Sequence, residues 1–121
     1  RVEALKLTHV RWMGELFAGD YSGPYLESRW KIGLVHVRIG LGPHWVEAVV
    51  SYLRAAAIEL IKAKIHDKDL QAAYTQSVVS ILDLDLMIIN LAYGEERLDR
   101  LSQFTGMSRK LIERCVTQKK T

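Results

Sequence analysis

The stretch that decides the fold is Trp30-Lys31-Ile32-Gly33-Leu34-Val35-His36-Val37-Arg38-Ile39-Gly40-Leu41. Its apolar residues recur at three- and four-residue spacing, which predicts a helix rather than a strand. His36 projects from an apolar ridge of this helix, between Ile32 and Ile39. Gly33 and Gly40 share its face and leave room beside the imidazole ring. Such a ring could hold the iron of a haem group, and a core histidine with hydrogen-bonded ring nitrogens is the alternative.

Glycine and proline predict the ends of further helices on either side of this segment. Pro24 and Pro43 each follow a glycine and suit the first turn of a helix, where the missing N–H costs nothing. The pattern predicts an all-α chain with four main helices over 1–18, 24–39, 43–65 and 69–98. A break at Thr105-Gly106 precedes a short last helix from Ser108 to Val116.

The composition restricts the class of protein. The chain has 121 residues, of which 49% are hydrophobic and 26% are charged, as expected for one ordinary globular domain. A net charge of +3 is too small to predict a polyanionic partner. The single cysteine, Cys115, excludes an internal disulfide and a Cys-x-x-Cys-His haem attachment, and it suits a reducing compartment. No apolar run approaches the roughly 18 residues of a membrane span, so we expect a cytoplasmic protein without a membrane partner.

The fourth predicted helix is apolar on nearly all sides between Ile81 and Leu91. A helix of this kind is buried on more than one side, which in a small protein predicts a homodimer. Asp83, Asp85 and Asn90 interrupt the apolar run. The two aspartates are two residues apart and point in different directions, so they predict a polar rim or an interface contact rather than an acid–base pair. No catalytic dyad is visible, and we do not expect an enzyme.

Residues 16–52 resemble the globin domain of bacterial globin-coupled sensors. Helix order and apolar pattern continue the resemblance through Tyr93. It implies a globin-like fold with only helices E, F, G and H, lacking the usual N-terminal globin helices. The residues that carry it are Leu16-Phe17-Ala18-Gly19, Tyr25-Leu26-Glu27, Arg29, Ile32-Gly33 and, above all, His36-x-Arg38-Ile39-Gly40-Leu41-x-Pro43-x-Trp45.

The resemblance also implies a function and a set of site residues. Residues 1–98 would bind haem b and sense oxygen or another diatomic gas, and residues 99–121 would lead to a missing output domain. His36 would be the proximal iron ligand, and the signal would pass through a dimer interface on helices G and H. The implied haem contacts are Leu5, Thr8, His9, Trp12, Ile32, His36, Ile39 and Trp45.

Three departures from the family concern the haem pocket. The early helices that carry a distal tyrosine are missing, and Val46 stands where the family has a second tyrosine. His9 lies four residues after Leu5 on the haem-facing stripe, where it could be a second axial ligand. An open distal side favours that role for His9. The alternative is a five-coordinate iron with Thr8 as the one polar group near bound gas.

Two rival functions remain from the sequence. One is a globin-like dimeric regulatory module that has lost haem. The other is a DNA-binding regulator, because residues 101–116 are similar to a helix-turn-helix that would present Arg109, Lys110 and Arg114 to the major groove. We favour a linker helix there, since no third supporting helix follows. Arg29, Lys31 and Arg38 beside the ligand helix are predicted to be solvated charges, with a haem propionate as the alternative partner.

Overall fold

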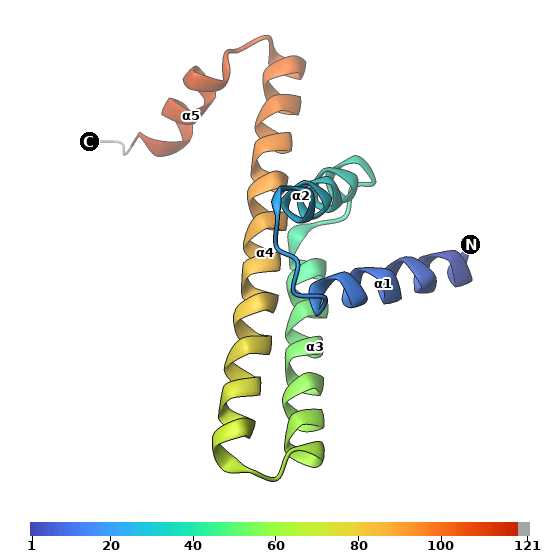
Figure 1. Ribbon diagram of the computed structural model, residues 1–121. Coiled ribbons are helices and arrows are strands. Elements are labelled where there is room, and N and C mark those ends of the chain that lie inside the picture. Colours follow the sequence, from blue (N-terminus) through green and yellow to red (C-terminus); the bar gives the residue numbers. More distant parts are fainter. Residues whose placement is uncertain (119–121) are drawn as a thin grey trace.

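The computed structural model describes residues 1–118, and every regular element in that part of the chain is an α-helix. The all-α prediction is therefore confirmed. The first three predicted ranges agree with the structure to within two residues at each end. The last three residues of the predicted linker, 119–121, lie outside the described residues. In chain order the helices are α1 (Val2–Leu16), α2 (Gly23–Arg38), α3 (Pro43–Lys64), α4 (Lys68–Thr105) and α5 (Arg109–Thr117) (Figure 1).

The helix ends follow from local chemistry. Pro24 and Pro43 stand in the first turns of α2 and α3. The side chain of Asp67 caps α4 by accepting a hydrogen bond from the Leu70 N–H at 2.9 Å, as expected for an aspartate before a helix. Gly106 ends α4 in the left-handed conformation, with a φ of 73°. This end comes seven residues later than the predicted end at residue 98.

The helices α2 and α3 pack against α4, which is the longest helix. In Figure 1, α3 and α4 run antiparallel through a short turn, and α2 lies across the upper half of α4. The first helix, α1, projects away from this group, so that the N-terminus lies far from α4. Residues 1–11 of α1 are all exposed, and the helix joins the core only near its C-terminal end. The main apolar cluster is built on Leu16, Val50 and Leu82, with Trp12, Val46, Val78, Ile81 and Leu86 packed against it.

Gly33 sets the close contact between α2 and α4. A Cβ atom at this position would lie 2.6 Å from the Cβ of Ala92 and 2.7 Å from the carbonyl oxygen of Ile89. Only a residue without a side chain fits there, because real Cβ atoms do not approach other atoms so closely. The prediction that Gly33 clears room beside His36 is therefore wrong, since Gly33 faces α4. Gly40 instead ends α2 with a φ of 72°, a conformation that favours glycine.

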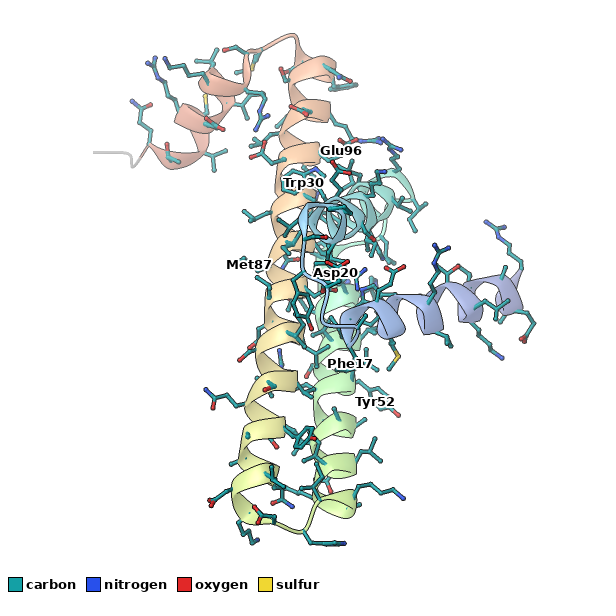
Figure 2. All side chains as sticks on the ribbon, viewed as in Figure 1. Phe17, Asp20, Trp30, Tyr52, Met87 and Glu96 are labelled. Atoms are coloured by element: carbon teal, nitrogen blue, oxygen red, sulfur yellow. The ribbon has the colours of Figure 1, made fainter. Side chains whose placement is uncertain are left out.

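The apolar run of α4 divides into two faces. Asp85, Ile89 and Ala92 follow each other at four- and three-residue spacing and are buried toward the other helices. Leu84, Met87 and Leu91 lie roughly opposite, at 100° per residue, and are exposed. Figure 2 shows Met87 on the side of α4 that points away from α2 and α3. The outward face accounts for the apolar excess between Ile81 and Leu91.

Among the described residues, α4 has the length and composition of a helix that can cross a membrane, with a mean hydropathy of 1.5 over an 18-residue window. One such helix is weak evidence for a membrane protein, because the core helix of a water-soluble protein passes the same test. A third of the window is buried inside the structure. The helix also carries the buried charge of Asp85 and packs against α2 and α3, as a core helix does.

Candidate functional site

His36 lies in the last turn of α2 and is half-buried. Its Nδ1 atom is 2.5 Å from the carbonyl oxygen of Ile32, one turn earlier. Because a carbonyl oxygen only accepts hydrogen bonds, Nδ1 must carry a proton, and in the neutral ring Nε2 then holds the free lone pair. Within residues 1–118 no hydrogen bond reaches Nε2. This is the arrangement of a metal-ligating histidine, whose other ring nitrogen donates to a backbone carbonyl.

The apolar residues predicted to contact haem lie on the surface of three elements. Leu5 of α1 is 55% exposed, Ile39 at the end of α2 is 68% exposed, and Trp45 in the first turn of α3 is 58% exposed. Ile32 is half-buried beside His36. A histidine with a free Nε2 and uncovered apolar side chains nearby in the chain fit the chemistry of haem, which needs one axial ligand and apolar surface.

The polar residues predicted on the distal side stand on the free part of α1. His9 is exposed, and so is Thr8, whose hydroxyl donates to the carbonyl oxygen of Ala4 at 2.9 Å. This bond within the helix is a common state for a helical threonine. The structure brings neither residue into a shared cavity with His36.

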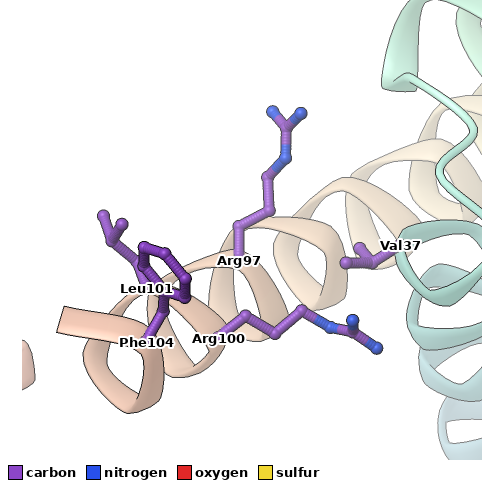
Figure 3. Close-up of a pocket in the computed structure, with 5 residues that line it drawn as sticks. All are labelled: Val37, Arg97, Arg100, Leu101 and Phe104. Carbon is purple, nitrogen blue, oxygen red and sulfur yellow. The ribbon is translucent and has the colours of Figure 1, made fainter. Parts of the chain in front are cut away.

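Two hollows are found elsewhere among the described residues. One, of about 270 Å³, lies between α1, α3 and α4. Trp12 lines it, so this predicted haem contact faces the helix bundle. The other, of about 470 Å³, is an open hollow between α2 and the upper part of α4 (Figure 3). Its lining includes Val37, the neighbour of His36, but not His36 itself; the lining residues are Val37, Arg97, Arg100, Leu101 and Phe104.

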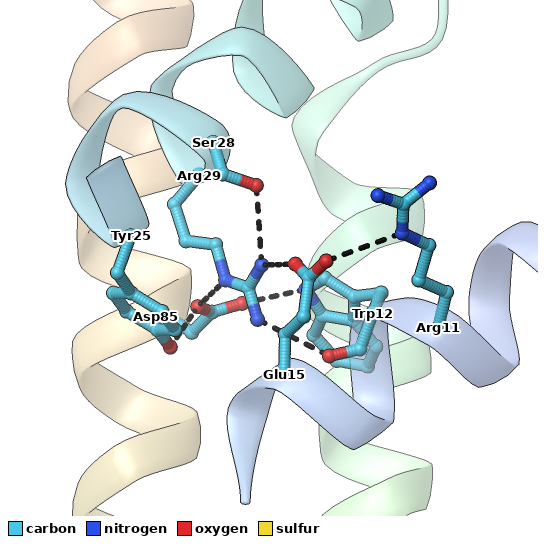
Figure 4. A network of polar contacts seen from close by, with 7 residues as sticks. All are labelled: Arg11, Trp12, Glu15, Tyr25, Ser28, Arg29 and Asp85. Carbon is cyan, nitrogen blue, oxygen red and sulfur yellow. Dashed lines mark hydrogen bonds and ion pairs between the residues drawn. The ribbon is translucent and has the colours of Figure 1, made fainter. Parts of the chain in front are cut away.

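A buried ion pair joins α2 to α4, and the sequence analysis missed it. Arg29 and Asp85 are both 0% exposed. Arg29 Nε donates to Asp85 Oδ1 at 2.6 Å, and the Tyr25 hydroxyl donates to the same oxygen at 2.7 Å. The indole Nε1 of Trp12 donates to Asp85 Oδ2 at 2.9 Å (Figure 4). Three helices therefore meet at one carboxylate.

The other guanidinium nitrogens of Arg29 hold α1. Nη2 donates to the backbone carbonyl of Trp12 at 3.1 Å, and Nη1 donates to Glu15 Oε2 at 3.0 Å. The ring of Tyr25 lies under the guanidinium, with the Arg29 Cζ atom 4.3 Å from the ring centre. The predictions that Arg29 is a solvated charge and that Asp85 belongs to a polar rim are both wrong. Asp83 is exposed and pairs with Arg54, so the two aspartates do point in different directions.

Burial and the network shift two pKa values. Burial, together with the hydrogen bond to Asp85, raises the pKa of Tyr25 to about 12. Burial alone would lower the pKa of Arg29, but the hydrogen bond and the charge of Asp85 outweigh it and raise that pKa above its ordinary value. Both shifts keep Tyr25 protonated and Arg29 charged at neutral pH, which is the state that the network needs.

A helical spacing in the sequence could have revealed this network. Tyr25, Arg29 and Gly33 follow each other at four-residue intervals, which places them on one face of α2. All three are buried against other helices. An aromatic residue and a glycine on one helix face indicate that this face is packed against another helix. A charged residue between them is then buried, and a buried charge needs an opposite charge on the neighbouring helix. The single aspartate on the inner face of α4 supplies that charge.

The last helix folds back against α4. Ile112 of α5 is buried, and Arg109 pairs with Glu95 and, at 3.1 Å, with Asp99 of α4. The hydrogen bond to Glu95 raises the pKa of Arg109. Ser108 caps α5, since its side chain accepts a hydrogen bond from the Leu111 N–H at 3.3 Å. The guanidinium of Arg109 is thus occupied by carboxylates of this chain, which does not favour a role in DNA contact.

The order of the helices defines the class of protein. A short first helix, a second helix that carries His36 and a long antiparallel pair correspond to helices E, F, G and H of a globin. The globin domain of the Geobacter sulfurreducens globin-coupled sensor is similar, with a TM-score of 0.72 and 34% sequence identity over 75% of this chain. The globin-like fold is therefore confirmed. This chain spans about 60% of that domain's length.

A family model described as Protoglobin matches residues 1–109. The chain belongs to the protoglobin family. The predicted relationship to sensor globins is confirmed by this match and by the solved globin domain.

Proposed function

We propose that this chain is the haem-binding part of a sensor for oxygen or another diatomic gas, with His36 as the proximal iron ligand. The observation that carries the proposal is the hydrogen bond from His36 Nδ1 to the Ile32 carbonyl oxygen, which leaves Nε2 free. The family and the sensor origin of the similar solved domain support it. The proposed cofactor is haem b, since no Cys-x-x-Cys-His motif is present for covalent attachment.

Each proposed residue has a defined task. Haem, when bound, supplies the iron that takes up the gas. The carbonyl oxygen of Ile32 fixes the tautomer and the orientation of the His36 ring. Apolar surface for the haem comes from Ile32, Ile39 and Trp45. Haem binding would remove this surface from water, which is favourable. The exposure of Ile39 and Trp45 in the described structure supports this task, because burying them would stabilise the complex.

Absorption spectra in the ferric, ferrous and CO-bound forms test the proposal. The wild-type chain should show a Soret band that shifts with each state. His36→Ala should lose haem or give the spectrum of unligated haem, whereas His44→Ala, at an exposed position in the first turn of α3, should match wild type. An alanine variant of His36 with wild-type spectra in all three states would refute the assignment.

The distal side is proposed to depend on His9 or Thr8 of α1. Residues 1–11 are exposed, so their side chains are open to a haem on this side, and we favour His9 as a second axial ligand. His9→Leu should then convert a low-spin ferrous spectrum to a high-spin one and speed the binding of CO. Unchanged spectra and CO kinetics would make His9 a bystander and assign the distal role to Thr8 and Leu5.

The rival without haem also has an observation in its favour, which is the openness of the site around His36. A purified wild-type chain without a Soret band, even after incubation with haemin, would support that rival.

The proposed setting of the domain extends the same function. The signal would pass through a homodimer formed by α3 and α4, with residues 1–98 as the sensor and residues 99–121 leading to an output domain. Asp99 lies within α4, so the proposed linker begins as a continuous helix. A cytoplasmic location and the absence of catalysis by this domain belong to the same proposal.

A further inference from the structure

The contacts between α2 and α4 are of two mechanical kinds. Gly33 lies directly against Ala92 and the backbone of Ile89. This contact is small, and no side-chain hydrogen bond gives it a direction, since glycine has no side chain. The contact at Arg29 and Asp85 is directional, because an N–H donor and a carboxylate oxygen hold a fixed geometry. A helix can slide over the first kind of contact but not over the second.

Burial makes the directional contact hard to open. Both side chains are 0% exposed, so no water can replace the partner that either would lose. Separating them would leave an unpaired charge inside the protein. The Tyr25 hydroxyl and the Trp12 indole complete the bonds to the same carboxylate. Movements of α2 relative to α4 should therefore occur elsewhere before this contact breaks.

The Arg29–Asp85 pair connects the helix that carries His36 to the helix that carries the exposed apolar face. Arg29 precedes His36 by seven residues on one helix, which is about 10 Å along the axis and nearly the same face. Asp85 shares the rigid helix α4 with the exposed outer face of Leu84, Met87 and Leu91. The pair therefore lies between the proposed iron ligand and the proposed subunit interface.

We propose that the Arg29–Asp85 pair is the positioning joint that fixes the ligand helix α2 to α4, so that a shift of α2 at His36 is passed to the outer face of α4. This inference rests on the proposed function for the source of the shift. The joint also includes α1, since Trp12 bonds to both Arg29 and Asp85, and Glu15 accepts a hydrogen bond from Arg29. The helices α1, α2 and α4 are thus held together at this one network of hydrogen bonds.

The test compares a variant without the joint with a matched control. Tyr25→Phe with Arg29→Met and Asp85→Leu removes the buried charges and keeps apolar volume, a replacement that folded proteins often tolerate. Arg54→Met with Asp83→Leu removes the exposed ion pair that links α4 to α3, two residues from Asp85. Arg29→Lys keeps the positive charge but loses the planar set of guanidinium N–H donors. This single variant replaces the triple variant in the test if the triple variant does not fold.

The readout is amide hydrogen exchange over residues 82–92 of α4 in the ferrous protein, with and without CO. Wild type and the control should show a CO-dependent change in α4. The triple variant should keep its Soret response and the change in α2 but lose most of the change in α4, and Arg29→Lys should lose part of it. A full α4 response in either joint variant, or none in haem-loaded wild type, would overturn the proposal.

A second arm works without haem and separates this inference from the proposed function. If the wild-type chain takes up no haem, the proposed function fails. The joint still predicts that the triple variant, compared with the control, exchanges amides of residues 12–16 and 25–33 faster by at least about tenfold. Equal exchange in the two variants would show that the pair does not hold these helices together, and would reject the joint.

Discussion

At the scale of single residues, Asp85 is the buried carboxylate at which three helices meet. Its carboxylate accepts hydrogen bonds from Trp12, Tyr25 and Arg29, which come from two other helices. The partner in the ion pair lies 56 residues away in the sequence. The four-residue spacing of Tyr25, Arg29 and Gly33 could have indicated that Arg29 is buried, but no local pattern identifies a partner so far away in the sequence. The role of His36 as iron ligand stays a prediction, and it rests on a contiguous motif.

The raised pKa of Tyr25 leads to a pH-dependent prediction. The folded pKa of about 12 lies above the ordinary value of 10.0. Tyr25 therefore stabilises the fold fully below pH 10, and this contribution is lost as the pH rises from 10 to 12. At pH 8, Tyr25→Phe should lower the free energy of unfolding by about 1.5–3 kcal/mol, as expected for a hydrogen bond to a charged group.

Urea unfolding of wild type and Tyr25→Phe at pH 8 and pH 11 measures this contribution. The difference in the free energy of unfolding between wild type and Tyr25→Phe should be smaller by about 1.4 kcal/mol at pH 11 than at pH 8. This amount follows at pH 11 when the pKa of Tyr25 is raised from 10.0 to about 12 by folding. A difference that stays constant, or widens, between these pH values would contradict the buried, hydrogen-bonded state of the Tyr25 hydroxyl.

At the scale of helices, the sequence predicts starts better than ends. Pro24, Pro43 and Ser108 mark predicted helix starts, and the structure confirms each of them. The cap at Asp67 is local chemistry of the same kind. The end of α4 was predicted too early, because the apolar pattern weakens after Tyr93. The helix continues to Thr105, where Gly106 ends it. The second half of this helix is stabilised by pairs such as Arg100 with Glu96, which hydrophobic periodicity does not detect.

The packing of α2 on α4 gives a prediction about two glycines. Gly33→Ala should destabilise the protein by about 1–3 kcal/mol, because the new methyl group would collide with Ala92 and the backbone of Ile89. Gly14→Ala serves as the control, since Gly14 lies in the last turn of α1 and a Cβ there meets nothing within 4 Å. That variant should stabilise the protein by about 0.5–1 kcal/mol. Thermal unfolding compares them, and similar effects of the two substitutions would argue against close contact of α2 with α4.

At the scale of the whole molecule, one side of α4 between Leu84 and Leu91 is uncovered within residues 1–118, while α5 packs near the C-terminal end of this helix. The helices α1, α2 and α3 lie on the other side (Figure 1). The uncovered face carries Leu84, Met87 and Leu91, all exposed. The sequence predicted this excess of apolar surface, but it could not show which residues point outward, because that depends on where α2 packs.

The exposed face predicts a homodimer, with a mass twice the 13.8 kDa of the chain. Sedimentation equilibrium at micromolar concentration should find the dimer in wild type. Met87→Glu with Leu91→Glu should weaken it by at least about a hundredfold, because burying unpaired carboxylates costs several kcal/mol. Val10→Glu, on the exposed side of α1, is the control and should stay dimeric. A monomeric wild type would refute this interface.

The central claim is that His36 Nε2 holds the haem iron, and chemical rescue tests it most directly. His36→Gly should lose the wild-type ferrous spectrum, and imidazole added to the solution should restore it by filling the space of the missing ring. Resonance Raman spectra of the ferrous protein should then show an iron–imidazole stretch that changes with isotopically labelled imidazole. Both proteins, with and without His36, carry His9→Leu for this measurement, because His9 is itself proposed as an axial ligand. An iron–histidine stretch that persists in His36→Gly without imidazole would then contradict the account.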